Sequence, residues 1–169
     1  MNKSQEFIKK CFLNLVKNGV VDENDICPAT VTDEEIDQLQ DKFNVKLPNF
    51  YRDFLKTYSF VFEELDAVVK DIYGNLSEHS IMLFRNLNDG LKELSERWED
   101  DNEAYGYHFL AHGYIPIGDW GAGWGPLCID THKDLKKVIL DNPKTWTVVW
   151  FDHEEFFGGN SLKDFQEAQ

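Results

Sequence analysis

The sequence predicts an α+β fold in which helices come first and strands follow. Apolar residues recur at helical spacing through residues 4–18, 32–46 and 48–58, whereas residues 107–151 hold short apolar runs between turn residues. Helices that precede a block of strands are typical of an α+β domain. We expect a single domain over residues 1–169, with a mainly antiparallel or mixed sheet and the N-terminal helices packed on it.

The boundaries of the first three helices can be placed from local signals. Gly19 should end the first helix, and Thr32 with Glu35 forms a capping box at the start of the second. The Leu47-Pro48 step should end that helix and start a third. The residues expected to form the buried stripe of the third helix are Tyr51, Phe54, Leu55 and Tyr58.

The middle of the chain has a mixed pattern. Strand-like runs occur near residues 60–62, 67–69 and 81–84, and a further helix is expected over about residues 88–98. The acidic run 99–103 should be a loop that closes this helix. Negative charge opposes the dipole at a helix C-terminus, so this loop is mildly unfavourable for stability. A solvated loop is the simpler interpretation, and a binding role is the alternative.

The last third should contain most of the sheet. Strands are expected at residues 107–110, 113–118, 127–130 and 145–151, with short helices at 135–140 and 161–168. The final strand is apolar on both faces, which predicts a central strand with Trp150 buried.

The charge of the chain restricts its partners. Among 169 residues, 31 are acidic and 17 are Lys or Arg, which gives a formal charge of −14. This argues against nucleic acid or an anionic membrane as a direct partner and is compatible with a basic protein. Solubility alone is the other explanation. Residues 1–20 carry Lys3, Lys9, Lys10 and Lys17 against Glu6, so +3 lies there and −14 − 3 = −17 lies in the rest.

The cysteines and the apolar segments suggest a cytoplasmic protein. No segment approaches the roughly 18 apolar residues that span a bilayer, and the N-terminus has helical spacing, unlike a secretion signal. Cys11, Cys27 and Cys128 form no CxxC pair, so we expect free buried thiols in a reducing compartment.

The glycine-rich segment 118–125 is the most distinctive feature. It follows a strand, contains Trp120 and Trp124 next to Asp119, and leads into a second strand. Phosphate binding is disfavoured because no Lys or Arg lies between residues 99 and 131 and Asp119 would repel an anion. Exposed tryptophan beside carboxylate is typical of protein interfaces. The alternative is that one or both tryptophans fold back over the core.

Catalytic and metal chemistry find little support. Asp119, Asp130, Asp152, His153 and Glu154 could share a metal if their strands were neighbours, but carboxylates that cap turns at strand ends are the simpler explanation. No nucleophile motif is present, and adjacent carboxylates in a strand point apart. We expect no catalytic residue, metal or cofactor. The candidate partner-binding residues are therefore Asp119, Trp120, Trp124, Asp130, Asp152, His153, Glu154 and Glu155.

Three segments together resemble the SUKH superfamily, which includes the Smi/Knr cell-wall regulators of fungi and many bacterial immunity proteins. They are the Thr32-to-Leu55 stretch with its Leu47-Pro48 break, the Ile115-to-Asp130 stretch with its glycines, and Val148 to Glu154, which ends in Asp-His-Glu. The resemblance covers residues 32–168 and leaves residues 1–31 without a counterpart. Two departures are Trp120 and Trp124, where polar residues are usual, and residues 57–60 in place of an Asn-Gly-Gly-type end.

The resemblance implies an α+β fold and a non-catalytic binding role. Bacterial members are similar to antitoxins that bind and block a cognate toxin of a polymorphic or contact-dependent system, often a basic nuclease. An intracellular scaffold or regulator of the cell-wall type is the alternative, and a metal-dependent hydrolase is a weaker one. The sequence does not specify the toxin or the oligomeric state.

Overall fold

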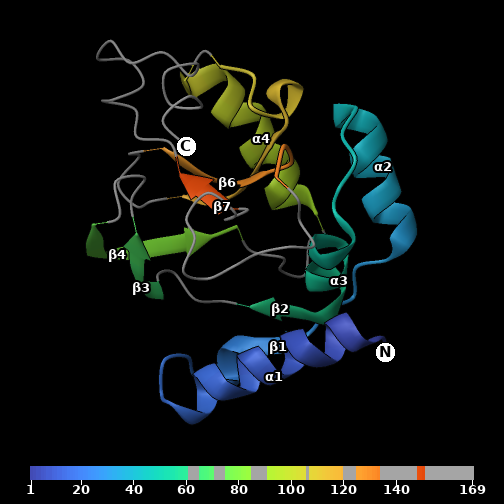
Figure 1. Ribbon diagram of the computed structural model, residues 1–169. Helices are drawn as coiled ribbons and strands as arrows, with labels where there is room; N and C mark the ends of the chain where they lie inside the picture. The colour runs from blue at the N-terminus through green and yellow to red at the C-terminus, as the bar shows by residue number, and fades with distance from the viewer. Residues whose placement is uncertain are drawn as a thin grey trace. The chain divides into compact units, whose positions relative to one another are not determined.

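The computed structural model describes residues 1–60, 65–70, 75–84, 91–105, 107–119, 125–133 and 148–150 (Figure 1). The chain forms two compact units, each treated separately below. Unit 1 comprises Met1–Glu63 and Phe84–Glu99, and unit 2 comprises Glu64–Leu83 and Asp100–Gln169. Unit 1 is mainly helical and unit 2 contains a five-stranded antiparallel sheet, so the predicted α+β class is confirmed. The single domain and the packing of helices on the sheet stay predictions.

The helix boundaries in unit 1 follow the predicted caps. Helix α1 (Lys3–Lys17) is followed by Gly19 at φ +68°, and α2 (Asp33–Phe43) begins with the predicted capping box. In that box the Thr32 hydroxyl accepts from the Glu35 amide, and the Glu35 carboxylate accepts from the Thr32 amide. Asn2 and Gln5 form a second capping box at α1, which the sequence analysis missed.

The Leu47-Pro48 step separates α2 from α3 (Asn49–Thr57), as predicted. Leu47 is buried, and its amide donates to the Gln40 side chain over 2.8 Å. Of the predicted stripe, Tyr51 and Leu55 are buried, whereas Phe54 and Tyr58 are half-buried.

The N-terminal helix packs on α3 through aromatic side chains. Phe12 is buried, with ring centroids 6.0 Å from Phe54 and 5.2 Å from Tyr58. After a short 3-10 turn, η1 (Glu23–Asp25), strand β1 (Ile26–Pro28) pairs antiparallel with β2 (Tyr58–Phe60). Residues 1–31 are therefore joined to the helical unit by side-chain packing and by a two-stranded sheet.

The predicted acidic loop at residues 99–103 is wrong, because helix α4 (Lys92–Tyr105) continues through it. The run contains no glycine or proline, and the first such residue after it is Gly106. Upstream, Trp98 is almost fully buried, and its ring contacts Phe43 edge-on at 5.2 Å. Glu99 lies 2.7 Å from the Nζ atom of Lys42, which offsets part of the charge at that point.

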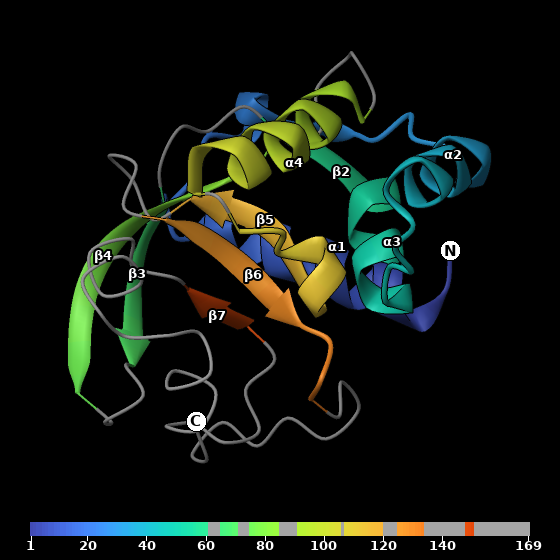
Figure 2. The same ribbon diagram turned by 90° about the horizontal axis from the view of Figure 1, so that it is seen from above.

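The sheet of unit 2 has the order β3-β4-β5-β6-β7, and every neighbouring pair is antiparallel (Figure 2). The strands are β3 (Leu65–Lys70), β4 (Leu76–Leu83), β5 (Tyr114–Asp119), β6 (Pro126–Asp130) and β7 (Val148–Trp150). All five residues of β6 are buried, as expected for a strand between two neighbours and shielded on both faces.

Three further expectations need correction or stay open. Residues 107–110 are not a strand: Phe109 is buried and the 3-10 turn η2 (Leu110–His112) follows, since Gly113 at φ +82° turns the chain into β5. Cys11 and Cys27 are free but exposed, and Cys128 is buried. The helices expected at 135–140 and 161–168 and the burial of Trp150 lie outside the described residues and side chains.

No helix in the described part of the chain has the length and apolar character to cross a membrane.

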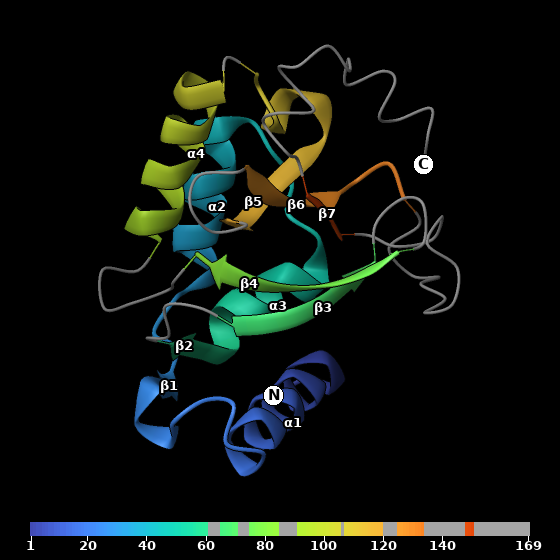
Figure 3. The same cartoon turned by 90° about the vertical axis from the view of Figure 1, so that its left-hand side faces the viewer.

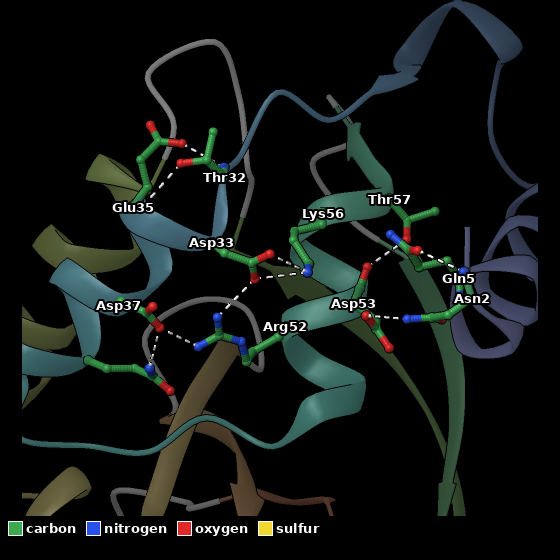
Figure 4. A network of polar contacts seen from close by, with 11 residues as sticks. Asn2, Gln5, Thr32, Asp33, Glu35, Asp37, Arg52, Asp53, Lys56 and Thr57 are labelled. Atoms are coloured by element: carbon green, nitrogen blue, oxygen red, sulfur yellow. Dashed lines mark hydrogen bonds and ion pairs between the residues drawn. The ribbon is translucent and has the colours of Figure 1, made fainter.

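Charged side chains tie α2 to α3 (Figure 4). The Arg52 guanidinium lies 2.7 Å from Asp37 and 2.9 Å from Asp33, and the Lys56 Nζ atom lies 2.9 Å from Asp33. Lys56 first, and Arg52 second, lower the pKa of Asp33 below its ordinary 3.8, while the carboxylates raise the pKa of Arg52. Asp33 also lies in the first turn of α2, where negative charge is favourable.

We expect the Asp33 carboxyl to titrate below 3.8 and Lys56→Met to raise its pKa towards that value. Because the folded-state pKa is depressed, the stabilising contribution is present above the unfolded-state pKa and is lost as the pH falls through the folded-state pKa. Carboxyl-carbon NMR titration measures this directly. Lys46→Met removes the same charge from an exposed position on the α2–α3 connection and is the control. An Asp33 pKa that is unchanged by Lys56→Met would contradict the contact between Asp33 and Lys56.

Candidate functional site

The β5–β6 hairpin fixes where the predicted site residues lie. Asp119 pairs with Pro126 at one end of the hairpin, and Tyr114 pairs with Asp130 at the other. Five residue steps of strand separate the two aspartates, which corresponds to about 16 Å. The structure therefore does not bring Asp119 and Asp130 together. We refer to the two ends of the hairpin as the Asp119 edge and the Asp130 edge.

At the Asp119 edge, β4 continues past the end of β5. It pairs with β5 only through Met82↔Asp119 and Leu83↔Gly118, whereas residues 76–81 pair with β3 (Figure 3). These two strands form a ribbon, called here the β3–β4 ribbon, that extends beyond Asp119 by about 20 Å of strand. Asp66 and Glu78 lie on this ribbon, at register positions opposite Ser80 and Val68.

Strand β7 ends at the same edge. Trp150, its last residue, pairs with Leu127, next to the Pro126↔Asp119 pair. Since β5 and β7 run in the same direction on either side of β6, the chain leaves both strands at the Asp119 edge. Trp120 and Trp124, which follow β5, and Asp152, His153, Glu154 and Glu155, which follow β7, lie outside the described residues.

An irregularity in β5 lies close to Asp119. The pairing with β6 shifts between Pro116 and Gly118, so Ile117 has no partner in the register. Proline cannot donate a ladder hydrogen bond, and a bulge here accommodates it. Bulges re-aim neighbouring side chains and are common beside functional sites. Asp119 itself is half-buried.

At the Asp130 edge a buried carboxylate holds a histidine. The Asp130 side chain is 3% exposed, and one of its oxygens, Oδ1, accepts from the His132 amide over 3.0 Å. The Nδ1 atom of His132 lies 2.7 Å from the same oxygen. Carboxylate oxygens only accept, so the contact places a proton on Nδ1 and fixes the orientation of the ring. Asp130 is thus oriented inward rather than presented to a partner.

Gly113 makes room for this arrangement. The Thr131 hydroxyl donates to the Gly113 carbonyl over 2.6 Å, and the Thr131 amide donates to the same carbonyl over 3.0 Å. A Cβ atom on Gly113 would lie 2.9 Å from the His132 ring and 2.9 Å from the Thr131 hydroxyl. The His132 ring also contacts Tyr114 at 5.2 Å between centroids.

Aromatic rings extend this packing. Tyr107 stacks on His112 with centroids 4.6 Å apart and meets Phe109 edge-on at 4.9 Å. Burial raises the pKa of the Tyr107 hydroxyl, and the nearby Tyr114 hydroxyl and Cys128 thiol add to the effect. Tyr107 itself is half-buried.

The two edges differ in what they can do chemically. At the Asp130 edge a buried carboxylate orients a half-exposed His132 ring against Tyr114, whereas the Asp119 edge carries a projecting ribbon and two strand ends. Among the described residues no group of three or more His, Cys, Asp or Glu side chains could hold a metal ion. Asp119 and Asp130 are too far apart to share one. A metal site that contains Asp119 therefore cannot also contain Asp130.

Sequence analysis missed His132 and Gly113. A carboxylate two residues before a backbone amide can form an Asx-type turn, so the Asp130-Thr131-His132 order was an available signal. The need for glycine at position 113 was not visible, because it depends on the His132 ring that lies against it.

We expect Gly113→Ala to cost about 2–4 kcal/mol of unfolding free energy, from backbone strain at positive φ together with overpacking. Gly19→Ala is the matched control: its φ is also positive, at +68°, but nothing lies within 4 Å of the added Cβ. Gly19→Ala should lower the unfolding free energy by about 1 kcal/mol. Denaturant unfolding measures both variants. Adding His132→Ala to Gly113→Ala should recover part of the loss, and equal losses at the two glycines would contradict the close approach.

Comparison with known proteins agrees with this architecture. Residues 30–167 match the model of the SMI1 / KNR4 family (SUKH-1). The match begins just before α2 and leaves α1, η1 and β1 outside it. No curated protein and no solved structure gave a match. The family match covers most of the chain and confirms the resemblance read from the sequence: the chain belongs to the SMI1 / KNR4 family (SUKH-1).

Proposed function

We propose that this chain is a non-catalytic immunity protein, an antitoxin that binds a cognate bacterial toxin domain and blocks it. The observation that carries the proposal is membership of the SUKH-1 family in a chain of charge −14. Toxins that act on nucleic acid need basic surfaces, because they must bind phosphates. An acidic inhibitor then associates faster with its partner and is held in the correct orientation by complementary charge.

The Asp119 edge is the surface we assign to the toxin. It brings the end of β5, the end of β7 and the β3–β4 ribbon to one side of the sheet. The sequence adds Trp120, Trp124, Asp152, His153, Glu154 and Glu155 directly after those strand ends. Tryptophans make up a large share of interface hot spots, and the carboxylates supply charge for a basic partner. Asp130, which is buried against His132, contributes to the fold instead of to the contact.

The most direct functional test uses the neighbouring reading frame. If that frame encodes a large secreted protein with a variable C-terminal domain, the domain is expressed with and without this chain. We expect cells to die with the domain alone and to survive with both. Cells that survive the domain alone, or die despite the chain, would contradict the proposal.

At the residue level, Asp119→Lys should weaken toxin binding by about tenfold or more, with most of the change in the association rate. Asp41→Lys makes the same change of charge at an exposed position on α2. It should change the affinity by less than about threefold, because only long-range electrostatic attraction, which salt screens, is affected there. Surface plasmon resonance at two salt concentrations measures both variants.

Trp120→Ala and Trp124→Ala complete this test. Loss of about 2 kcal/mol of affinity with unchanged unfolding free energy marks an interface residue. Unfolding of both variants, or full affinity in both, would contradict the assignment of the two tryptophans to the binding surface.

Asp119→Asn is the control for Asp119→Lys. It removes the charge but keeps the shape of the side chain, so it separates an effect of charge on affinity from an effect on folding.

A regulator or scaffold of the cell-wall type is the second candidate, since the family that the chain matches is itself the SMI1 / KNR4 family. That reading predicts several partners of moderate affinity and no toxin frame beside the gene. Purification with the chain as bait distinguishes the two: one basic partner in stoichiometric amount supports the antitoxin, and a set of signalling or cell-wall proteins supports the regulator.

A further inference from the structure

Helix α1 presents a defined outward face, because its inner face is fixed. Phe12 is buried against Phe54 and Tyr58, and the Asn2 side chain donates to the Asp53 carboxylate over 3.0 Å (Figure 4). Asp53 is itself 9% exposed. A hydrogen bond at the N-cap and a buried aromatic in the second half of the helix hold it in one rotation about its axis.

The outward face combines three lysines and one glutamate, Glu6, with large apolar side chains. Lys3, Lys10 and Lys17 recur every seven residues and so lie along one line of the helix surface. Phe7 is 68% exposed and Leu13 is 53% exposed, and helical geometry places one on each side of that line. The large exposed apolar residues among the described residues are Met1, Phe7, Leu13, Val20, Phe50 and Leu76, so most of them lie in the first twenty residues.

The charge of this face is opposite to that of the remaining chain. Residues 1–20 carry +3, whereas residues 21–169 carry −17. A basic toxin suited to the acidic part would be repelled by α1. The α1 segment also precedes the region that matches the family, 30–167. The charge of this face is therefore unsuited to the basic partner that the remaining chain suits.

Two kinds of partner, a second copy of the chain and an anionic membrane, fit the outward face of α1 poorly. In an antiparallel pair of α1 helices, Lys10 would face Lys10 and Lys3 would face Lys17, which opposes a symmetric contact with a second copy. An anionic bilayer would attract the lysines, but Asp22, Glu23 and Asp25 follow the helix directly and the whole chain carries −14. A flat membrane surface would meet those charges as well.

We propose that the outward face of α1 docks an acidic amphipathic segment of a partner protein, distinct from the basic toxin. Carboxylates of that segment pair with Lys3, Lys10 and Lys17, and its apolar side chains cover Phe7 and Leu13. Helix α1 has 15 residues, about 22 Å, which a partner helix of similar length would span. A lysine line between two apolar flanks matches a helix with glutamates along one line and leucines beside it.

The test uses a designed probe, a helical peptide of α1's length with glutamate every seven residues and leucine on both flanks. Titration of the full chain, followed by backbone NMR, should give saturable shifts confined to α1 and its flanking residues. Lys10→Glu and Phe7→Ser should each weaken the dissociation constant by about tenfold or more. Lys46→Glu makes the same charge change elsewhere, and Leu76→Ser removes an equally exposed apolar group; both should leave binding within about twofold.

Each of the other outcomes overturns the proposal. No saturable binding of the peptide would do so, as would equal weakening by Lys10→Glu and Lys46→Glu, which indicates nonspecific charge attraction. Sedimentation of the chain with phosphatidylserine vesicles, lost in Phe7→Ser, would assign the face to a membrane. Concentration-dependent self-association, also lost in Phe7→Ser, would assign it to a second copy. All substituted positions are exposed, so circular dichroism should show an unchanged fold.

Discussion

The antiparallel register of β5 and β6 is the constraint on which the site depends. It sets Asp119 opposite Pro126 and Tyr114 opposite Asp130, so each end of the hairpin receives one aspartate. Every residue of β6 is buried, so a slip of one residue would move each side chain, Asp130 included, into close packing built for a different one. The different positions of the Asp119 and Asp130 carboxylates follow from this pairing.

The proposed function places recognition at one end of this hairpin, and the buried carboxylate lies at the other. At the Asp130 edge a buried carboxylate, an oriented His132 and a glycine at positive φ form a packed contact. At the Asp119 edge the sheet does not end evenly, because β4 continues beyond β5 as the β3–β4 ribbon. Rigid strands that end beside such a ribbon hold side chains in place for a partner without requiring the core to move.

Local signals in the sequence were sufficient for the first three helices and for the approximate positions of β5 and β6. Capping residues and the Leu47-Pro48 break act through nearby backbone groups, so they can be read without tertiary information. The acidic run at 99–103 was predicted as a loop, but it contains no glycine or proline and follows the buried Trp98, and the helix continues through it to Tyr105. The inward role of Asp130 depends on strand pairing and on His132, which spacing alone does not reveal.

Hydrogen–deuterium exchange of the chain, alone and bound to its cognate toxin domain, tests the central claim most directly. The account predicts slower exchange in the complex for peptides that cover residues 117–127 and the β3–β4 ribbon, with no change at residues 107–114 and 130–133. Protection confined to the Asp130 edge, or absent from residues 117–127, would contradict the assignment of recognition to the Asp119 edge.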